Sequence, residues 1–252
     1  DPDDPASPDR GGCVAILTPG RMLSRHVAGM ASNSCLIEVA KWADAADANY
    51  ATNYAMAIDV SRCIGCYNCF LACRDEHAGN DHLPVAVAQP EHGQKWIDVR
   101  EQERGSFPRV RVSYVPVPCQ QCADAPCIDG SGAVYRRQDG IVLIDPARAI
   151  GRSDIVSSCP YRAIFWNASL DVPQKCTFCA HLLDAGWKVP RCVEVCPTQA
   201  LVFGDTSAPE SPISRLRAAS SLEELQPDLR VRPQVGYLGQ QVGLRRMSAM
   251  PE

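Results

Sequence analysis

Twelve of the fourteen cysteines stand at spacings typical of thiolate ligands. They form four groups along the chain, and the first group has the pattern CxxCxxCxxxC. The groups are Cys63, Cys66, Cys69 and Cys73; then Cys119, Cys122 and Cys127; then Cys159 alone before a proline; and last Cys176, Cys179, Cys192 and Cys196. Closely spaced thiolates of this kind hold [4Fe–4S] clusters, which accept and release electrons. The residues therefore predict electron-transfer chemistry.

Two other uses of cysteine fit the pattern less well. Disulfides form in oxidising compartments, and we find no signal peptide or twin-arginine pair that would direct the chain to one. Structural zinc needs four ligands, commonly two close pairs, and the last group of four cysteines would satisfy this need in isolation. The first group is too dense for a single tetrahedral zinc site, so iron–sulfur clusters are the favoured interpretation.

The ligands of two clusters are expected to cross over between the first and last groups. In two-cluster ferredoxins, three cysteines of one run bind one cluster and the fourth binds the other, because the fourth starts a helix that points away. The first predicted cluster is therefore held by Cys63, Cys66, Cys69 and Cys196. The second is held by Cys73, Cys176, Cys179 and Cys192.

The middle of the chain has one complete set of ligands and one set that is missing. Cys119, Cys122, Cys127 and Cys159 complete a third cluster. The same spacing rules place a fourth set at Ser131, Ala149, Arg152 and Ile155, none of which is cysteine. A serine oxygen could in principle bind iron, but alanine and isoleucine cannot. We therefore expect three [4Fe–4S] clusters and a vacated fourth site, with Arg152 filling or salt-bridging part of it. Cys13 and Cys35 lie outside all groups.

Charge and hydropathy exclude some partners. The net charge of −4 gives no reason to expect nucleic acid, and no run of about 18 apolar residues could span a bilayer. We expect a cytoplasmic protein. Lys175 and Arg191 each precede a predicted ligand, so their charge either raises a cluster's potential or is ordinary surface charge. Four histidines near the predicted cluster loops are expected to be solvated or hydrogen-bonded rather than ligands: His77, His82, His92 and His181.

The first 55 residues differ from the rest of the chain. They begin with an acidic, Pro- and Gly-rich stretch, so 1–55 is interpreted as a flexible extension or as an over-long gene prediction, with a short helix possible at Ala40–Ala48. The iron–sulfur domain is expected at 56–205, and a C-terminal helix and partner-wrapping tail at 206–252. The best helix candidate in the tail is Ile213–Leu225, after a proline.

Short strands are expected between the cysteine groups. Alternating β-branched residues with a Gly/Pro break predict two strands over Lys95–Val117, and Ala133–Asp145 predicts a hairpin that turns at Asp139-Gly140. Ala163–Trp166 and Ala200–Phe203 are expected to be strands that follow cluster loops. The predicted fold is α+β, with two ferredoxin-like modules of the bacterial 2[4Fe–4S] type. The second module, at about 106–170, is inserted in the first.

In these motifs the chain resembles the iron–sulfur subunits of the molybdopterin oxidoreductase (dimethyl sulfoxide reductase) superfamily. The resemblance covers roughly Met56–Leu238 and extends most closely to small subunits of pyrogallol–phloroglucinol transhydroxylases and related aromatic hydroxylases. It is carried by Arg100–Arg109 and by the segments IDVSRCIGCYNCFLACRDEH, GAVYRRQDGIVLIDP, SSCPYRAIFWN and QKCTFCAHLLD. Those small subunits also lack the third motif's cysteines.

The resemblance implies a non-catalytic electron-transfer subunit in a heterodimer. Its large partner would bind molybdenum or tungsten in a bis-pterin guanine dinucleotide cofactor and act on a hydroxylated aromatic ring. In four-cluster relatives the cluster of the third motif faces a membrane subunit, so its loss makes a membrane anchor unexpected. Two alternatives stay open: a respiratory complex with a membrane anchor that reduces a sulfur, nitrogen or arsenic oxyanion, and clusters that only brace the subunit interface.

Overall fold

The computed structural model describes residues 53–77 and 95–239. Residues 1–52 of the expected N-terminal extension, with its helix at Ala40–Ala48, lie outside the described residues, as do the tail beyond residue 239, Cys13 and Cys35. The last residues of the expected extension, Tyr54 and Ala55, belong to strand β1 (Tyr54–Asp59). Within the described part the elements are short and mix helices with strands, which confirms the predicted α+β class. No helix among these residues is long and apolar enough to cross a bilayer.

A three-stranded sheet joins the two ends of the described chain. Strand β1 (Tyr54–Asp59) lies in the middle, between antiparallel β8 (Leu201–Asp205) and parallel β9 (Val235–Leu238). Met56 in β1 pairs with Phe203 on one side and with Val235 on the other, and all three side chains are buried. Both faces of β1 are covered, with Met56 and Ile58 in the main core and Ala55 and Ala57 packed with Ile213, so its sequence is a nearly continuous apolar run. The strands expected at the first loop and at Ala200–Phe203 are confirmed.

The C-terminal region differs from the prediction. Helix α5 (Pro212–Ala219) ends six residues before the expected Leu225, because Ser220 takes an extended conformation with φ −147°. The described part of the predicted tail, up to residue 239, packs on the domain: β9 pairs with β1, and the backbone amide of Ala123 donates to the carbonyl of Arg232 at 2.8 Å. A strand of four residues in Pro- and Arg-rich surroundings gives almost no sequence signal, and burial against β1 determines it.

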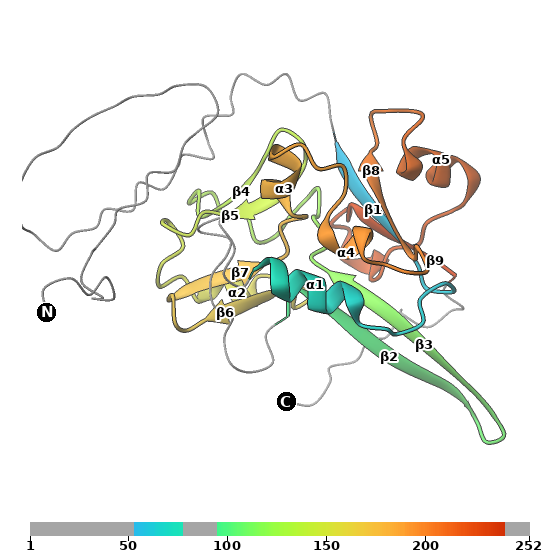
Figure 1. Ribbon diagram of the computed structural model, residues 1–252. Helices are drawn as coiled ribbons and strands as arrows, with labels where there is room; N and C mark the ends of the chain where they lie inside the picture. Colours follow the sequence, from blue (N-terminus) through green and yellow to red (C-terminus); the bar gives the residue numbers. More distant parts are fainter. Residues whose placement is uncertain (1–52, 78–94, 240–252) are drawn as a thin grey trace, which may run out of the picture. The chain divides into compact units, whose positions relative to one another are not determined.

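The longest strands form the predicted hairpin between the first two cysteine groups. β2 (Ile97–Ser106) and β3 (Arg109–Pro118) pair antiparallel along their whole length. Their paired ends are buried, as at Ile97 and Val117, whereas Phe107 at the turn is 92% exposed. Figure 1 shows the hairpin projecting beyond the other elements. The two strands expected over Lys95–Val117 are confirmed.

Two smaller hairpins carry the middle of the chain. β4 (Val134–Arg136) and β5 (Val142–Ile144) form the predicted hairpin, and Gly140 supplies the positive φ of +85° that its turn requires. β6 (Ile164–Asn167) is the expected strand after Cys159, and it pairs with β7 (Val172–Lys175), which was not predicted. The short helix α2 (Asp154–Ser157) packs against β6.

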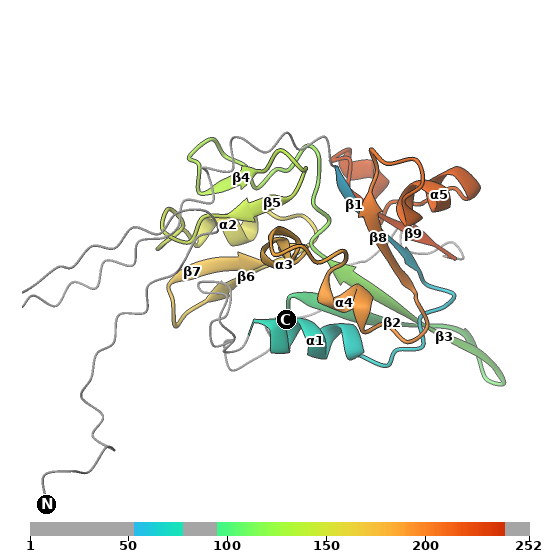
Figure 2. The same ribbon diagram turned by 45° about the horizontal axis from the view of Figure 1, so that its top comes forward.

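Three short helices lie at the cysteine groups. Cysteines lie within α1 (Asn68–Glu76) and α4 (Arg191–Glu194), whereas α3 (Ala180–Asp184) begins directly after Cys179, and a 3₁₀ turn, η2 (Pro227–Leu229), precedes β9. Helix α1 packs against α4, and Figure 2 shows the two lying side by side. This contact brings the first cysteine group to the last one, although Glu76 at the end of α1 and Arg191 at the start of α4 are 115 positions apart in sequence.

Candidate iron–sulfur sites

The structure brings the twelve described cysteines into three groups of four. Electrostatic contacts between thiols link Cys63 with Cys66 and Cys196, Cys73 with Cys176, Cys179 and Cys192, and Cys122 with Cys119, Cys127 and Cys159. Cys69 contacts Cys63 and Cys196 and also borders Cys192. We call these groups site 1 (Cys63, Cys66, Cys69, Cys196), site 2 (Cys73, Cys176, Cys179, Cys192) and site 3 (Cys119, Cys122, Cys127, Cys159). Each is a set that the crossover rule assigns to one cluster.

Site 1 is a loop folded around a small pocket. All four of its cysteines line this pocket, together with Ile64, Gly65, Tyr67, Val99, Pro116, Thr198 and Leu201. Gly65 has φ +67°, and a Cβ at this position would lie 2.6 Å from the ring of Tyr114. Only glycine therefore allows the loop both its backbone conformation and its close approach to the hairpin. The loop can line this pocket with thiols because Gly65 stands between Cys63 and Cys66.

Site 2 depends on the contact between α1 and α4. Cys73 lies on α1 and Cys192 on α4, and both are buried. Cys176 and Cys179 come from the turn between β7 and α3, where Phe178 and Cys179 take left-handed conformations. Cys196 belongs to site 1, so the four cysteines of the last group do not meet as the zinc alternative requires.

Sites 1 and 3 share a local motif at their last cysteine. Cys159 and Cys196 are each followed by a proline and, four residues on, by an alanine whose amide donates to the sulfur. The N···Sγ distances are 3.4 Å at Ala163 and 3.3 Å at Ala200. Arg162 and Gln199 hold equivalent left-handed positions in the two copies. Amide donors to sulfur are among the features that set cluster potentials.

Burial makes these groups unfavourable for thiolates that have no cation. Burial and neighbouring thiols raise the pKa of Cys69, of Cys122 and of Cys176 each to about 12. Cys196 is the exception: burial raises its pKa, but hydrogen bonds from Thr198 and from the amides of Ala200 and Leu201 outweigh that effect and lower it. A group of four sulfurs that are mostly buried or half-buried fits a cofactor that supplies positive charge inside the group, as iron does.

The groups differ from the site of a single ion. Among the described residues, no three Cys, His, Asp or Glu side chains are arranged to hold one metal ion. A cubane takes one thiolate on each of four iron atoms, so its ligands surround a larger volume than a single ion does. Sites 1 to 3 also follow one another in space, since Cys69 borders Cys192 and Cys176 borders Cys119.

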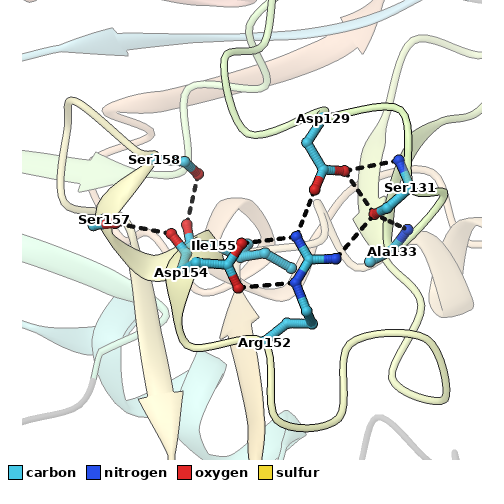
Figure 3. Close-up of polar contacts among 8 residues, drawn as sticks. All are labelled: Asp129, Ser131, Ala133, Arg152, Asp154, Ile155, Ser157 and Ser158. Atoms are coloured by element: carbon cyan, nitrogen blue, oxygen red, sulfur yellow. Dashed lines mark hydrogen bonds and ion pairs between the residues drawn. The ribbon is translucent and has the colours of Figure 1, made fainter.

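The four non-cysteine positions of the expected fourth site also gather beside site 3. Arg152 donates to Ser131 Oγ at 3.2 Å and forms ion pairs with Asp154 at 2.7 Å and with Asp129 at 2.5 Å. Asp129 in turn accepts from the amide and hydroxyl of Ser131. Figure 3 shows the guanidinium lying between the two carboxylates and the serine. We call this set of Asp129, Ser131, Arg152 and Asp154 the arginine lock.

Apolar side chains occupy the region behind the lock. Ala149 and Ile155 are buried in one cluster with Ala133, Val134, Val142 and Ile164, against which Cys127 and Cys159 of site 3 also pack. Salt bridges and methyl groups therefore fill the place where the spacing rules expect four more thiolates. The side chains of Ser131 and Arg152 thus make polar contacts with other protein groups, and those of Ala149 and Ile155 pack in the apolar cluster.

The described histidines bind protein groups. His77 is buried, stacks on Trp96 with ring centroids 3.7 Å apart, and has Nδ1 2.6 Å from the carbonyl oxygen of Cys73. Burial lowers the pKa of His77 to about 4. His181 Nε2 lies 2.9 Å from Glu76, to which Arg191 also binds. The expectation of hydrogen-bonded rather than ligating histidines fits both; His82 and His92 lie outside the described residues.

Sequence reasoning missed several residues that contact the sites. Thr198 and Gln121 bind ligand residues, Thr198 through the sulfur of Cys196 and Gln121 through the carbonyl of Cys176. A threonine after Cys-Pro and a glutamine inside CQQC give no signal on their own. Lys175 was left open between surface charge and a role in tuning, and the structure places it in the interior, 2% exposed.

Comparison with known proteins gives the class of this chain. Residues 110–206 match the family model of the 4Fe-4S dicluster domain. The chain is 43% identical to the pyrogallol hydroxytransferase small subunit of Pelobacter acidigallici, over 73% of this chain and 68% of the relative. It is 38% identical to the thiosulfate reductase electron transfer subunit of Salmonella typhi, over 62% of this chain and 78% of the relative. It is 28% identical to the arsenate respiratory reductase iron-sulfur subunit of Shewanella sp., over 73% of this chain and 94% of the relative.

Fold, thiol groups and matched domain together define a ferredoxin-type protein that carries [4Fe–4S] clusters. The chain belongs to the iron–sulfur electron-transfer subunits of molybdopterin oxidoreductases.

Proposed function

We propose that this subunit carries three [4Fe–4S] clusters, at sites 1, 2 and 3, and serves a molybdopterin catalytic subunit that acts on hydroxylated aromatic compounds. The observation that carries the proposal is the row of three complete thiol groups that ends at a filled fourth site. The similarity to a pyrogallol hydroxytransferase small subunit supports the substrate class. The molybdenum or tungsten bis-pterin cofactor belongs to the partner, and no residue of this chain is assigned to it.

The proposed architecture is two ferredoxin-like modules, the second inserted in the first. Its support is topological. β1 and α1 pack against β8 and α4, so the first and last parts of the described chain form one unit around sites 1 and 2. The segment at about 106–170 between them supplies the ligands of site 3 and the residues of the arginine lock.

Site 1 is the proposed contact with the catalytic subunit. Of the twelve described cysteines, Cys66 is exposed, and the others are buried or half-buried. Three large apolar side chains beside it are also exposed: Ile64, Tyr67 and Leu71. Exposed apolar side chains grouped at a cluster loop suit a partner surface that excludes water from the path of the electron. When bound, a cluster there would exchange single electrons with the partner, while Gly65 keeps the loop close to Tyr114.

The other end of the row supports a complex that does not hand electrons to a membrane subunit. Past site 3 the arginine lock and the apolar side chains around Ile155 occupy the positions of the expected fourth ligand set, so the row of thiol groups in the described residues is not continued there. We propose a heterodimer without a membrane anchor on this ground. The expected cytoplasmic location stays a prediction.

A second candidate function is electron transfer in a respiratory reductase of inorganic oxyanions. The similarity to iron–sulfur subunits of thiosulfate and arsenate reductases favours it. A third alternative, clusters that only brace the subunit interface, differs in its redox behaviour. Bracing clusters need not change state when the substrate of the partner is added, whereas electron-transfer clusters must.

The test uses the complex purified anaerobically with its catalytic subunit. Iron and acid-labile sulfide should each come to about twelve per chain beyond those of the partner, four for each of three sites. Electron paramagnetic resonance should resolve three signals that titrate reversibly, and pyrogallol rather than thiosulfate or arsenate should support turnover. A count near sixteen would refute the vacated site. Turnover with an oxyanion instead would move the assignment to the respiratory class.

A further inference from the structure

Lys175 is a buried cation between two of the thiol groups. It ends β7 directly before Cys176 of site 2, and only 2% of its side chain is exposed. Its Nζ donates to the carbonyl oxygen of Val142, and also to that of Cys176 at 3.2 Å. Among the described residues these hydrogen-bond partners are neutral. A lysine buried this deeply requires negative charge nearby to remain an ammonium ion.

Gln121 binds the same two residues from the opposite module. It lies inside the CQQC segment of site 3 and is 1% exposed. Its Nε2 donates to the carbonyl oxygen of Cys176 at 2.9 Å, and its Oε1 accepts from the amide of Val142 at 2.8 Å. Lys175 and Gln121 thus hold one backbone position of site 2 and one of β5 together. We call this set of Gln121, Val142, Lys175 and Cys176 the inter-site bridge.

The clusters proposed for sites 2 and 3 would provide the negative charge. Lys175 directly precedes Cys176 of site 2 and shares the carbonyl oxygen of that residue with Gln121, which stands between Cys119 and Cys122 of site 3. A cubane held by four thiolates is a net anion, and reduction adds one more negative charge. A fixed cation close by therefore stabilises the reduced form more than the oxidised form.

We propose that Lys175, bound to backbone positions that Gln121 also holds, is the residue that raises the reduction potentials of the clusters at sites 2 and 3 together. The inference rests on the proposed function, since it requires clusters at those sites. It makes Lys175 a positioning and tuning residue rather than a ligand. The cation keeps two neighbouring clusters at matched potentials, so that an electron passes between them without a large step in energy.

The experiment compares K175M, K175R and K188M in the anaerobic complex with the catalytic subunit. Lys188 is an exposed lysine and serves as the matched control. Redox titration followed by electron paramagnetic resonance gives each midpoint. In K175M, the reduced-to-oxidised ratio of sites 2 and 3 at the wild-type midpoint should fall about tenfold or more, which is about 59 mV for a one-electron couple. K175R should restore it, and K188M should leave it unchanged.

Site 1 is the internal reference, because Lys175 directly precedes a cysteine of site 2 and is bound to the carbonyl oxygen of that cysteine rather than to a residue of site 1. Its signal is identified by its loss in C66S. If the K175M complex keeps about twelve irons per chain and all its reduction midpoint potentials are unchanged, the inference is overturned while the proposed function stands. Should K175M lose iron, Q121E decides, since it adds a negative charge to the same bridge and must lower the same two midpoints. If the wild-type complex has no clusters at sites 2 and 3, the proposed function itself is refuted, independently of the role of Lys175.

Discussion

Arg152 donates a hydrogen bond from Nη1 to the hydroxyl oxygen of Ser131 at 3.2 Å. The two residues stand where the spacing of the cysteine groups expects ligands of one more cluster. Around their contact, Asp129 and Asp154 complete a set of charges that satisfies itself. Positions that the spacing rules assign to a metal cofactor are therefore joined by contacts between protein groups.

Replacing Arg152 by alanine should destabilise the fold modestly. The substitution leaves Asp129 and Asp154 without their shared cation, and we expect the thermal midpoint to fall by roughly 2–4 °C at neutral pH. Hydrogen bonds donated by Ser131, and then by Arg152, hold the pKa of the Asp129 carboxyl well below its usual range. The stabilisation by the ionised Asp129 is therefore present above about pH 4 and is lost on further acidification. The control is R148A at an exposed arginine. Equal midpoints for the two variants would contradict a role for the lock.

Replacing Ile155 by alanine should cost more than losing the lock. Ile155 is buried in the apolar cluster beside site 3, so its truncation leaves a cavity and should lower the free energy of unfolding by about 2–5 kcal/mol. Urea unfolding of the loaded protein measures the change. I150A, at an isoleucine that is 61% exposed, is the matched control and should change little. A small effect at both positions would show that the apolar side chains around Ile155 are loosely packed.

Single serine substitutions test the crossover of ligands. C73S and C196S should each lower the iron content by about four per chain, but they should abolish different resonance signals. Cys73 contacts the thiols of site 2, and Cys196 contacts those of site 1, although each lies next to members of the other site in sequence. Loss of the same signal in both variants would mean that the cysteines pair within their own runs.

The cysteine groups were predictable because ligand spacing is a local constraint. A cubane forces three thiolates into one tight loop, so CxxCxxC and the separate partner cysteine can be recognised without knowing the fold. The vacated positions followed from the same arithmetic. That they would be filled by the arginine lock rather than by solvent depended on Asp129 and Asp154, which no spacing rule selects.

Gly65→Ala should remove the cluster at site 1 while sparing the others. An alanine would face both the positive φ of +67° and the ring of Tyr114 at 2.6 Å, and the φ alone costs about 1–2 kcal/mol. Iron should fall by about four per chain. G130A provides the control, because Gly130 also has a positive φ but no atom within 4 Å of the added Cβ. If both variants keep all their iron, the close approach to Tyr114 is not required.

Tyr237→Phe should show that the C-terminal strand is part of the domain. The buried hydroxyl of Tyr237 donates to the carbonyl oxygen of Pro116 at 3.2 Å and accepts from Gln120. Its removal leaves buried polar groups unpaired, at a cost of about 1–3 kcal/mol in the free energy of unfolding. Y67F, which removes an exposed hydroxyl, should change the value little in the same urea titration. A neutral Y237F would argue that β9 is dispensable.

The parts that sequence could not predict are those fixed by tertiary burial. Val235–Leu238 has four residues, too few for a period, and becomes a strand because β1 offers it an unpaired edge. The helix after Pro212 stops at Ala219 rather than at Leu225, because Ser220 turns to an extended conformation and Leu225 is buried as a loop residue. Lys175 could not be told from surface charge because its burial depends on Gln121 and Val142, both distant in sequence.

The crossed connection between the chain ends also determines when each thiol group can be completed. Site 3 closes between Cys119 and Cys159, 40 positions apart, whereas site 1 needs Cys63 and Cys196, which are 133 positions apart, and site 2 needs Cys73 and Cys192. Synthesis from the N-terminus therefore provides all four cysteines of site 3 once Cys159 has been added, whereas site 2 waits for Cys192 and site 1 for Cys196.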